Sequence, residues 1–158
     1  MTEKDREFMR RAISLAQNGI DRNAGGPFGA VVVKDAEIVG EGFNQVTSTN
    51  DPTAHAEIVA IRAACQNLNN FQLDGCVLYT SCEPCPMCLG AIYWARPERV
   101  FYACTREDAA NIGFDDQFIY EEIEKNFEHR QMKLVNLLRD EGLTIFENWA
   151  DKADKTKY

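Results

Sequence analysis

The chain has 158 residues, enough for one domain with a hydrophobic core of its own. Hydrophobic residues make up 45% and charged residues 27%, as in ordinary soluble globular proteins, and no apolar run approaches the roughly 18 residues that a membrane-spanning helix needs. The net charge of −8, without a cluster of Lys and Arg among aromatics, argues against a phosphate backbone as partner and favours a small uncharged substrate.

The predicted elements begin with a helix over residues 3–20, where apolar residues recur at helical spacing and Gly19 is expected to end the helix. Residues 28–34 and 37–43 then predict a β-hairpin with a turn between them. The segment DPTAHAEIVAIRAACQNL predicts a helix with Asp51 as its cap and Pro52 at its first position.

The second half of the chain continues the alternation of strands and helices. The expected elements are, in order, a short buried strand over 75–81, a helix over 84–95, a strand over 99–104 and a broken helical stretch over 106–125. MKLVNLL, residues 132–138, fits a strand or a helix, and residues 143–154 predict a closing helix. This alternation indicates an α/β sandwich, and the antiparallel hairpin beside parallel strands makes its sheet mixed.

The N-terminal stretch MTEKDREFMRR is charged and lacks the apolar region of a secretory signal peptide. It therefore predicts a cytoplasmic protein, in a compartment where thiols stay reduced. The six cysteines are accordingly expected to be metal ligands or small buried residues, and not disulfide partners.

Three of the cysteines stand at strict intervals of three in TSCEPCPMC, at Cys82, Cys85 and Cys88. An iron–sulfur run would need a fourth cysteine where Ile92 stands, so that pattern fails. Cys85 and Cys88 alone would also suit a redox pair at a helix N-terminus. Cys82, at a strand end, is favoured as a small buried residue.

The decisive motif lies upstream, in AHAE. His55 and Glu57 stand at the start of one predicted helix, and Pro84-Cys85-x-x-Cys88 starts another about 30 residues later. This H-x-E…P-C-x-x-C arrangement is the signature of the zinc-dependent deaminases.

The chemistry of these residue types supports a zinc site. One imidazole and two thiolates suit Zn²⁺, and three protein ligands leave the fourth position for the water of a catalytic site. A closed structural site would need Cys82 or His129 as well, but the polar stretch around His129 favours a solvated residue. Glu57 is expected to move protons beside that water, although a first-turn acid can also simply complement a helix dipole.

At these residues the chain resembles the cytidine deaminase-like superfamily, over nearly its whole length. The segments GGPFGAVVVKD, EGFNQV, NDPTAHAE, YTSCEPCPMCLGAIYWARPERVFYA and GFDDQFIYEEI together look like the short bacterial guanine deaminases. PTAHAE and EPCPMC also occur in tRNA adenosine deaminases, so they indicate the superfamily and not the base. GFDDQF and the tail ending in Tyr158 are what favour guanine.

The resemblance implies a three-layer α/β/α sandwich around a mixed five-stranded sheet, with residues 1–158 as one zinc-dependent deaminase domain. It implies hydrolysis of guanine, a small purine, to xanthine and ammonia in guanine catabolism, with one Zn²⁺ per chain. It further implies a homodimer, in which the C-terminal segment, about residues 140–158, is exchanged between subunits.

The resemblance also suggests residues that bind the base. Asp116 is expected to accept hydrogen bonds from the N–H and amino donors on the N1/C2 edge of guanine, with its neighbour Asp115 as the alternative. A site built around such a buried carboxylate rejects bases that lack those donors. Asn44, at the end of the second strand, suits the N7 and O6 atoms of a purine. Three aromatic residues are expected to stack on or cover the ring: Phe28, Trp94 and Tyr158. Cys65, Cys76 and Cys104 are expected in the core.

Two alternatives stay open, one in the same class of enzyme and one that is not an enzyme. A related deaminase could act on guanosine, a cytosine compound, a triazine or tRNA adenosine. A non-catalytic zinc-binding module is the third reading, and the presence of Glu57 counts against it, because a closed site of cysteine and histidine does not need that carboxylate.

Overall fold

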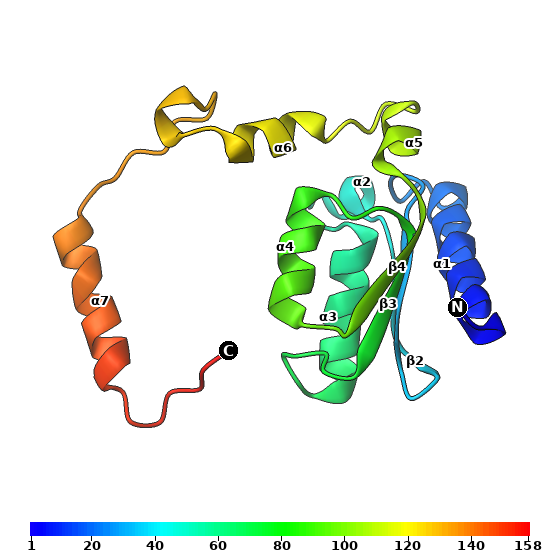
Figure 1. Ribbon diagram of the computed structural model, residues 1–158, viewed down its shortest axis with the longest axis horizontal. Coiled ribbons are helices and arrows are strands. Elements are labelled where there is room, and N and C mark those ends of the chain that lie inside the picture. The colour runs from blue at the N-terminus through cyan, green and yellow to red at the C-terminus, as the bar shows by residue number, and fades with distance from the viewer. The chain divides into compact units, whose positions relative to one another are not determined.

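The chain forms a mixed four-stranded sheet between helices (Figure 1), in a computed structural model that describes residues 1–158. The strand order is β2-β1-β3-β4, with β3 and β4 parallel and the other neighbours antiparallel. The strands are β1 Gly29–Lys34, β2 Glu37–Phe43, β3 Cys76–Cys82 and β4 Arg99–Cys104. The predicted hairpin and mixed sheet are confirmed, but the expected count of five strands is wrong for this chain, since residues 132–138 form no regular element.

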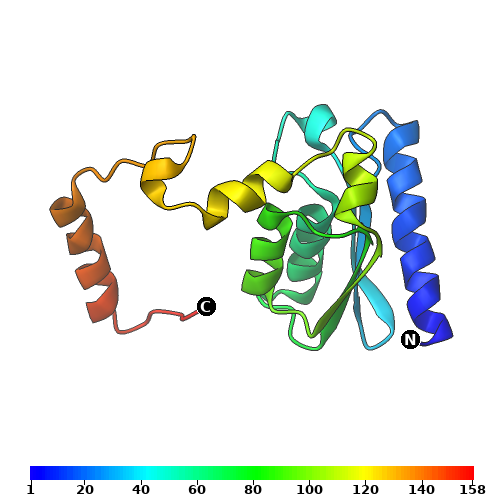
Figure 2. The ribbon, with the colours of Figure 1, turned by 45° about the horizontal axis from the view of Figure 1, so that its top comes forward.

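Contacts divide the chain into two compact units, Met1–Phe118 and Ile119–Tyr158. The first unit holds the sheet, with helix α1 Glu3–Asp21 on one face and helices α3 Ala56–Leu68 and α4 Pro86–Ala95 on the other (Figures 1 and 2). This is the predicted α/β/α layering. The remaining helices are α2 Val46–Thr49, α5 Arg106–Ala110, α6 Gln117–Glu124, the 3-10 helix η1 Phe127–His129 and α7 Arg139–Asp151. No helix combines the length and the apolar character needed to cross a membrane.

Helix α1 begins with a capping box and passes through Gly19. The side chain of Thr2 accepts the backbone N–H of Asp5, whose carboxylate also accepts the hydroxyl of Tyr79 at 2.7 Å and so ties α1 to β3. The prediction that Gly19 ends this helix is wrong, because the helix continues to Asp21. Gly19 instead gives room to Phe43, whose ring would lie 3.2 Å from an added Cβ.

Helix α3 begins one turn later than predicted, at Ala56, with His55 in the N-cap position. Asp51 does not cap it, because its carboxylate accepts both the backbone N–H and the hydroxyl of Thr53, at 2.8 and 2.7 Å. That Asx turn occupies the residues that the prediction gave to the first helical turn. His55 therefore has extended backbone, with φ −69° and ψ 156°, and precedes the helix rather than lying within it.

Strand β2 lies against the backbone of α3 at two glycines. A Cβ added at Gly40 or Gly42 would lie far inside contact distance of helix backbone, at Ala60 and Ala56 respectively. This close approach fixes the start of α3 directly over β2. Around it, the core on this face is built largely of small and β-branched side chains, such as Ala30, Val32, Ala56, Ala60 and Ala64.

The expectation that three further cysteines lie in the core is met only at Cys76, which is fully buried. Cys65 is partly buried. Cys104 is exposed, because β4 is an edge strand whose residues are mostly exposed in the first unit.

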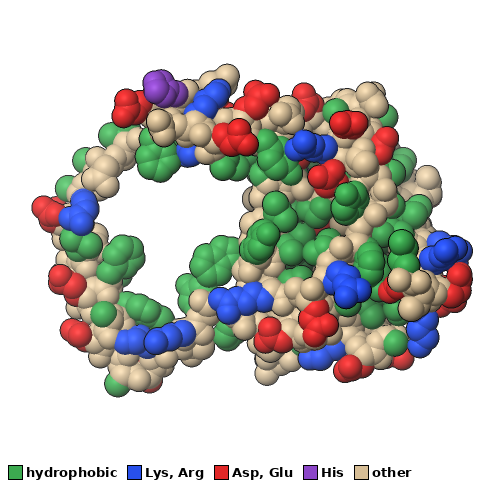
Figure 3. Space-filling view, in the orientation of Figure 1, with side chains coloured by type: hydrophobic (Ala, Val, Ile, Leu, Met, Phe, Trp, Pro, Cys, Tyr) green, Lys and Arg blue, Asp and Glu red, His purple; other side chains and the backbone are tan.

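The second unit, Ile119–Tyr158, contains most of α6, then η1 and α7. Arg130 organises its middle: the guanidinium donates to the carbonyl oxygens of Lys125 and Ile123 and lies over the ring of Phe127. None of its residues is buried, and hydrophobic side chains are visible at its surface (Figure 3). The large exposed hydrophobic residues include Val135, Leu137, Ile145, Phe146 and Trp149.

Candidate metal centre and active site

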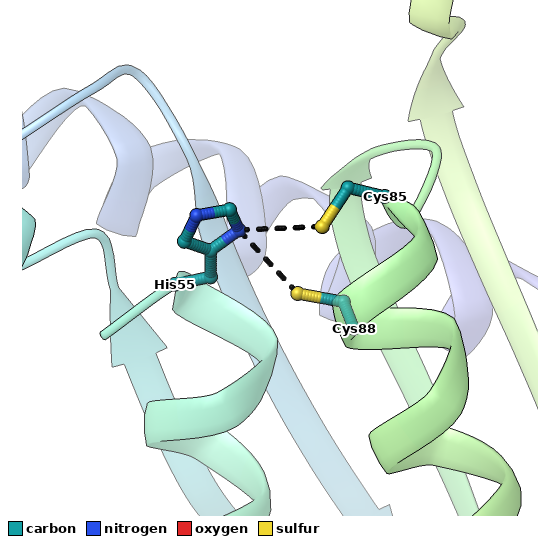
Figure 4. A group of neighbouring side chains, drawn as sticks. All are labelled: His55, Cys85 and Cys88. Carbon is teal, nitrogen blue, oxygen red and sulfur yellow. Dashed lines mark hydrogen bonds between the residues drawn. The ribbon is translucent and has the colours of Figure 1, made fainter. Parts of the chain in front are cut away.

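His55, Cys85 and Cys88 converge between the starts of α3 and α4 (Figure 4). Nδ1 of His55 lies 3.5 Å from Sγ of Cys85 and 3.5 Å from Sγ of Cys88. His55 and Cys85 are the N-cap residues of the two helices, so the positive ends of both helix dipoles lie beside the thiols. The sequence motif thus becomes one cluster of three donors within 4.8 Å of one another.

The spacing of these donors fits a tetrahedral zinc ion. Zn–N bonds of about 2.05 Å and Zn–S bonds of about 2.3 Å at tetrahedral angles place the nitrogen and sulfur about 3.6 Å apart. The observed distances are 3.5 Å. A hydrogen bond from Cys88 lowers the pKa of the Cys85 thiol to about 4, which favours the thiolate form that binds zinc.

Cys82 stands outside the metal cluster. It is buried at the end of β3, and its thiol donates to the carbonyl oxygen of Thr105 at 3.5 Å. Burial raises the pKa of this thiol to about 11, which favours the neutral form over a metal-binding thiolate. His129 is exposed and belongs to the second unit. The cluster is therefore a three-donor site with an open fourth position, as catalytic zinc sites are.

Glu57 is buried beside the cluster, with 5% of its surface exposed, and lines the same pocket as His55 and Cys85. Burial raises the pKa of its carboxyl group, and the negative charge of Cys85 raises the pKa further. The thiol of Cys88 hydrogen-bonds to this carboxylate and lowers the pKa. A buried carboxyl group with a raised pKa beside a metal site has the properties of a general acid–base group.

A pocket of about 760 Å³ opens at the metal cluster, and all of its lining residues belong to the first unit. It brings together Phe28, Asn44, Asp115 and Asp116 from the predicted set of base-contacting residues. The ring of Phe28 meets the ring of Phe114 edge to face, with centroids 5.0 Å apart. The pocket therefore joins a metal site, a buried acid and an aromatic wall.

Asn44 is fixed in one orientation at the pocket wall. Its side-chain Oδ1 accepts the backbone N–H groups of Gly26 and Val46, each at 3.2 Å, and the residue is 4% exposed. Because the oxygen is occupied, the amide nitrogen is the group left to serve as donor. Asn44 can therefore serve a ligand in the pocket as a hydrogen-bond donor, which suits acceptors such as the N7 and O6 atoms of a purine.

The two neighbouring aspartates differ in their surroundings. Asp115 is exposed, and its carboxylate accepts the backbone N–H of Gln117 at 2.9 Å. Asp116 is partly buried, burial raises the pKa of its carboxyl group, and its charge acts on His55. Asp115 is thus used at the start of α6, and Asp116 is the aspartate whose charge acts on the metal cluster.

Trp94 and Tyr158 are not among the residues that line this pocket. Trp94 lies on the exposed side of α4, and Tyr158 ends the second unit. Their expected contacts with the base stay predictions.

Glu83, Arg106 and Phe114 also line the pocket, although none of them was predicted from the sequence. Glu83 and Phe114 stand inside motifs discussed above, Glu83 two residues before Cys85 and Phe114 next to Asp115, so their position in those motifs was the available signal. Arg106 carried no such signal, because it follows a strand in a stretch without a motif.

Comparisons with known proteins agree with this site. Residues 2–104 match the family described as the cytidine and deoxycytidylate deaminase zinc-binding region. Guanine deaminase from Bacillus subtilis is 57% identical over 96% of this chain and 97% of its own. A tRNA-specific adenosine deaminase from Buchnera aphidicola is 34% identical over 94% and 95%.

Two solved structures bear on the fold. The X-ray structure of the Bacillus subtilis guanine deaminase superposes with a TM-score of 0.94 at 56% identity, covering 97% of this chain and 98% of that one. A guanine deaminase from Nitrosomonas europaea has a TM-score of 0.64 at 34% identity, covering 69% and 63%. With the family match, the three-donor cluster and the buried Glu57, the chain belongs to the zinc-binding cytidine and deoxycytidylate deaminase family.

Proposed function

We propose that the chain hydrolyses guanine to xanthine and ammonia, with one zinc ion per chain held by His55, Cys85 and Cys88. The observation that carries this proposal is one pocket that joins the metal cluster and Glu57 to Asp116. The guanine deaminase from Bacillus subtilis, 57% identical over nearly the whole chain, supports the choice of base.

The reaction replaces the 2-amino group of guanine by oxygen from water. Zinc, when bound, supplies the Lewis acid that lowers the pKa of the attacking water. Glu57 takes the proton from that water, delivers it to a ring nitrogen next to C2, and carries the second water proton to the departing amino group. Water and guanine thus become xanthine and ammonia, and Glu57 ends in its starting protonation state.

Two polar side chains orient the purine in this proposal. The carboxylate of Asp116 accepts the N–H donors on the N1/C2 edge, and the amide nitrogen of Asn44 donates to an acceptor such as O6 or N7. Adenine and cytosine present different donors and acceptors, which leaves buried groups of this pocket unpaired. Acidic groups lining the pocket also disfavour a phosphate: Glu57, Glu83, Asp115 and Asp116.

An assay of ammonia release tests this function. The zinc-loaded protein is offered guanine, guanosine, adenine, adenosine and cytosine, and guanine is expected to react fastest. Preference for guanosine, or for adenosine in tRNA, would move the chain to a related deaminase activity. If the zinc-loaded protein releases ammonia from none of these substrates, the result would favour the non-catalytic zinc module.

Asp116→Asn is expected to weaken catalysis on guanine, measured as kcat/KM, by roughly tenfold to hundredfold. The amide keeps the size of the side chain but replaces a charged acceptor, and such a hydrogen bond is worth about 1.5–3 kcal/mol. Asp115→Asn is the matched control, because that carboxylate is used by Gln117 in the structure. If both changes have equal and small effects on kcat/KM, neither aspartate is the residue that recognises the base.

We also propose that the chain forms a homodimer in which the C-terminal unit packs on the partner subunit. That unit buries none of its residues, although its surface carries many large apolar side chains. Such a surface is typical of a segment that binds another protein surface. The sequence predicts that about residues 140–158 are exchanged between the two subunits. In this proposal the exchanged segment is the whole unit, Ile119–Tyr158.

The edge of the sheet offers a matching surface. Strand β4 pairs only with β3, so its outer edge presents unpaired backbone groups. On the neighbouring α4, Tyr93 and Trp94 are 75% and 65% exposed. Residues 132–138 of a second copy are the occupant we propose for this edge, since their apolar pattern suits a strand.

Deletion of residues 154–158 tests the tail. The truncated chain should keep its fold and zinc but lose at least about tenfold in guanine turnover, because we propose that Tyr158 of a second copy covers the pocket and excludes water. Tyr158→Ala, with the tail at full length, separates the ring from the rest of the segment. Mixing the truncated chain with Glu57→Gln chains should recover activity if the tail crosses between subunits. A truncated enzyme as active as the full chain would leave Tyr158 without this role.

A cytoplasmic location and a role in guanine catabolism complete the proposal. The likeness to a guanine deaminase over nearly the whole chain supports this role.

A further inference from the structure

Glu83 stands between the metal loop and the segment that carries Asp116. It lies two residues before the ligand Cys85, and it lines the pocket without belonging to the metal cluster. Its carboxylate Oε2 accepts the backbone N–H of Arg106 at 3.1 Å. Arg106 is the first residue of α5, so this carboxylate binds an N–H that the helix itself leaves unpaired.

Two more hydrogen bonds join the same segments. The backbone N–H of Glu83 donates to the carbonyl oxygen of Cys104 at 2.8 Å, and the thiol of Cys82 donates to that of Thr105 at 3.5 Å. Residues 82–83 and 104–106 are therefore connected at three successive points, and of the three bonds only the one to Arg106 depends on the Glu83 side chain.

From α5 the connection continues to the aspartates. The carbonyl oxygen of Ala109 accepts the backbone N–H of Phe114 at 3.0 Å, and that of Ala110 accepts the N–H of Gly113 at 2.9 Å. Asp115 and Asp116 follow directly. The position of α5 therefore sets where the chain delivers Asp116 to the pocket.

We propose that Glu83 is a positioning residue for Asp116: its carboxylate holds the first turn of α5, and α5 in turn holds the loop that presents Asp116 to the purine. The inference rests on the proposed function, in which Asp116 reads guanine. Arg106 lines the same pocket, and its positive charge partly offsets the burial that raises the pKa of Asp116.

Equilibrium binding of guanine to zinc-loaded protein carrying Glu57→Gln measures this role without turnover. In that background, Glu83→Ala should weaken guanine binding by about fivefold or more, a size typical of coupled neighbours. Glu83→Gln should restore binding to within about twofold, because its amide oxygen still accepts from Arg106. Glu107→Ala is the matched control, since it removes an exposed carboxylate from the first turn of the same helix.

A double-mutant cycle distinguishes positioning from direct contact. If Glu83 acts through Asp116, adding Glu83→Ala to Asp116→Asn should weaken binding no further, to within about twofold. Additive losses would mean that Glu83 contacts guanine independently, and an unaffected Glu83→Ala protein would also overturn the inference. Zinc content and Tm are measured for each variant. If Glu83→Ala does not fold, Glu83→Asp serves the same comparison, because its shorter side chain cannot reach Arg106.

Failure of the proposed function has a different signature. No guanine binding by the Glu57→Gln parent would overturn the guanine assignment and the inference with it. Guanine binding that Asp116→Asn leaves unchanged would overturn the role of Asp116, and therefore that of Glu83, while the guanine assignment stands.

Discussion

Glu57→Gln is expected to keep the fold and the zinc ion. It should lower guanine turnover by about 10²–10⁴-fold or more, because general acid–base catalysis usually contributes a factor of that size. Glutamine has nearly the same size as glutamate, so the buried site beside Cys88 stays filled. What the change removes is the group that accepts a proton from water and passes it to the purine. The measurement is kcat for ammonia release, with metal analysis and Tm on the same sample.

The matched control is Glu98→Gln, which makes the same chemical change at an exposed position. It should leave kcat unchanged. Near-normal turnover by the Glu57→Gln protein would refute the proton-transfer role. Loss of zinc from that protein would instead mean that Glu57 supports the metal cluster and not only the chemistry.

Cys85→Ala and Cys88→Ala are each expected to remove zinc and activity together. Each change leaves His55 with a single thiolate, and two donors hold zinc far more weakly than three. Zinc content should fall from about one ion per chain to a small fraction, and turnover should fall with it. Metal analysis after dialysis against a mild chelator, followed by the ammonia assay, measures both.

Cys82→Ala provides the matched control for these two changes. It removes a thiol that is also buried and lies in the same segment, but one that hydrogen-bonds to the carbonyl oxygen of Thr105. This variant should keep its zinc. Loss of zinc from the Cys82→Ala protein would show a closed site with four protein ligands and would contradict the open fourth position.

The metal cluster could be predicted from the sequence because its three donors stand in short motifs at the starts of two helices. None of the three ligand positions depends on the exact register of the rest of the chain. The start of α3 was harder to predict, since Asp51 can cap a helix or form an Asx turn, and its contact with Thr53 decides for the turn. His55 is an N-cap residue for that reason.

The pocket wall and the sheet edge could not be predicted in the same way. Arg106 reaches the pocket because α5 follows the end of β4, which depends on how the strands are ordered. The exposure of Cys104 likewise depends on what covers β4. Residues 132–138 fit two patterns, and a strand forms only where an edge is available to pair with it.

The two glycines of β2 that lie against α3 have a consequence for the tolerance of the chain to substitution. Gly40 and Gly42 take no part in the chemistry, yet any side chain there would push away the helix that begins just after His55 and carries Glu57. The distance from His55 to the thiols of α4 would change with it. Substitutions at Gly40 and Gly42 are therefore expected to disturb the metal cluster, although neither residue belongs to it.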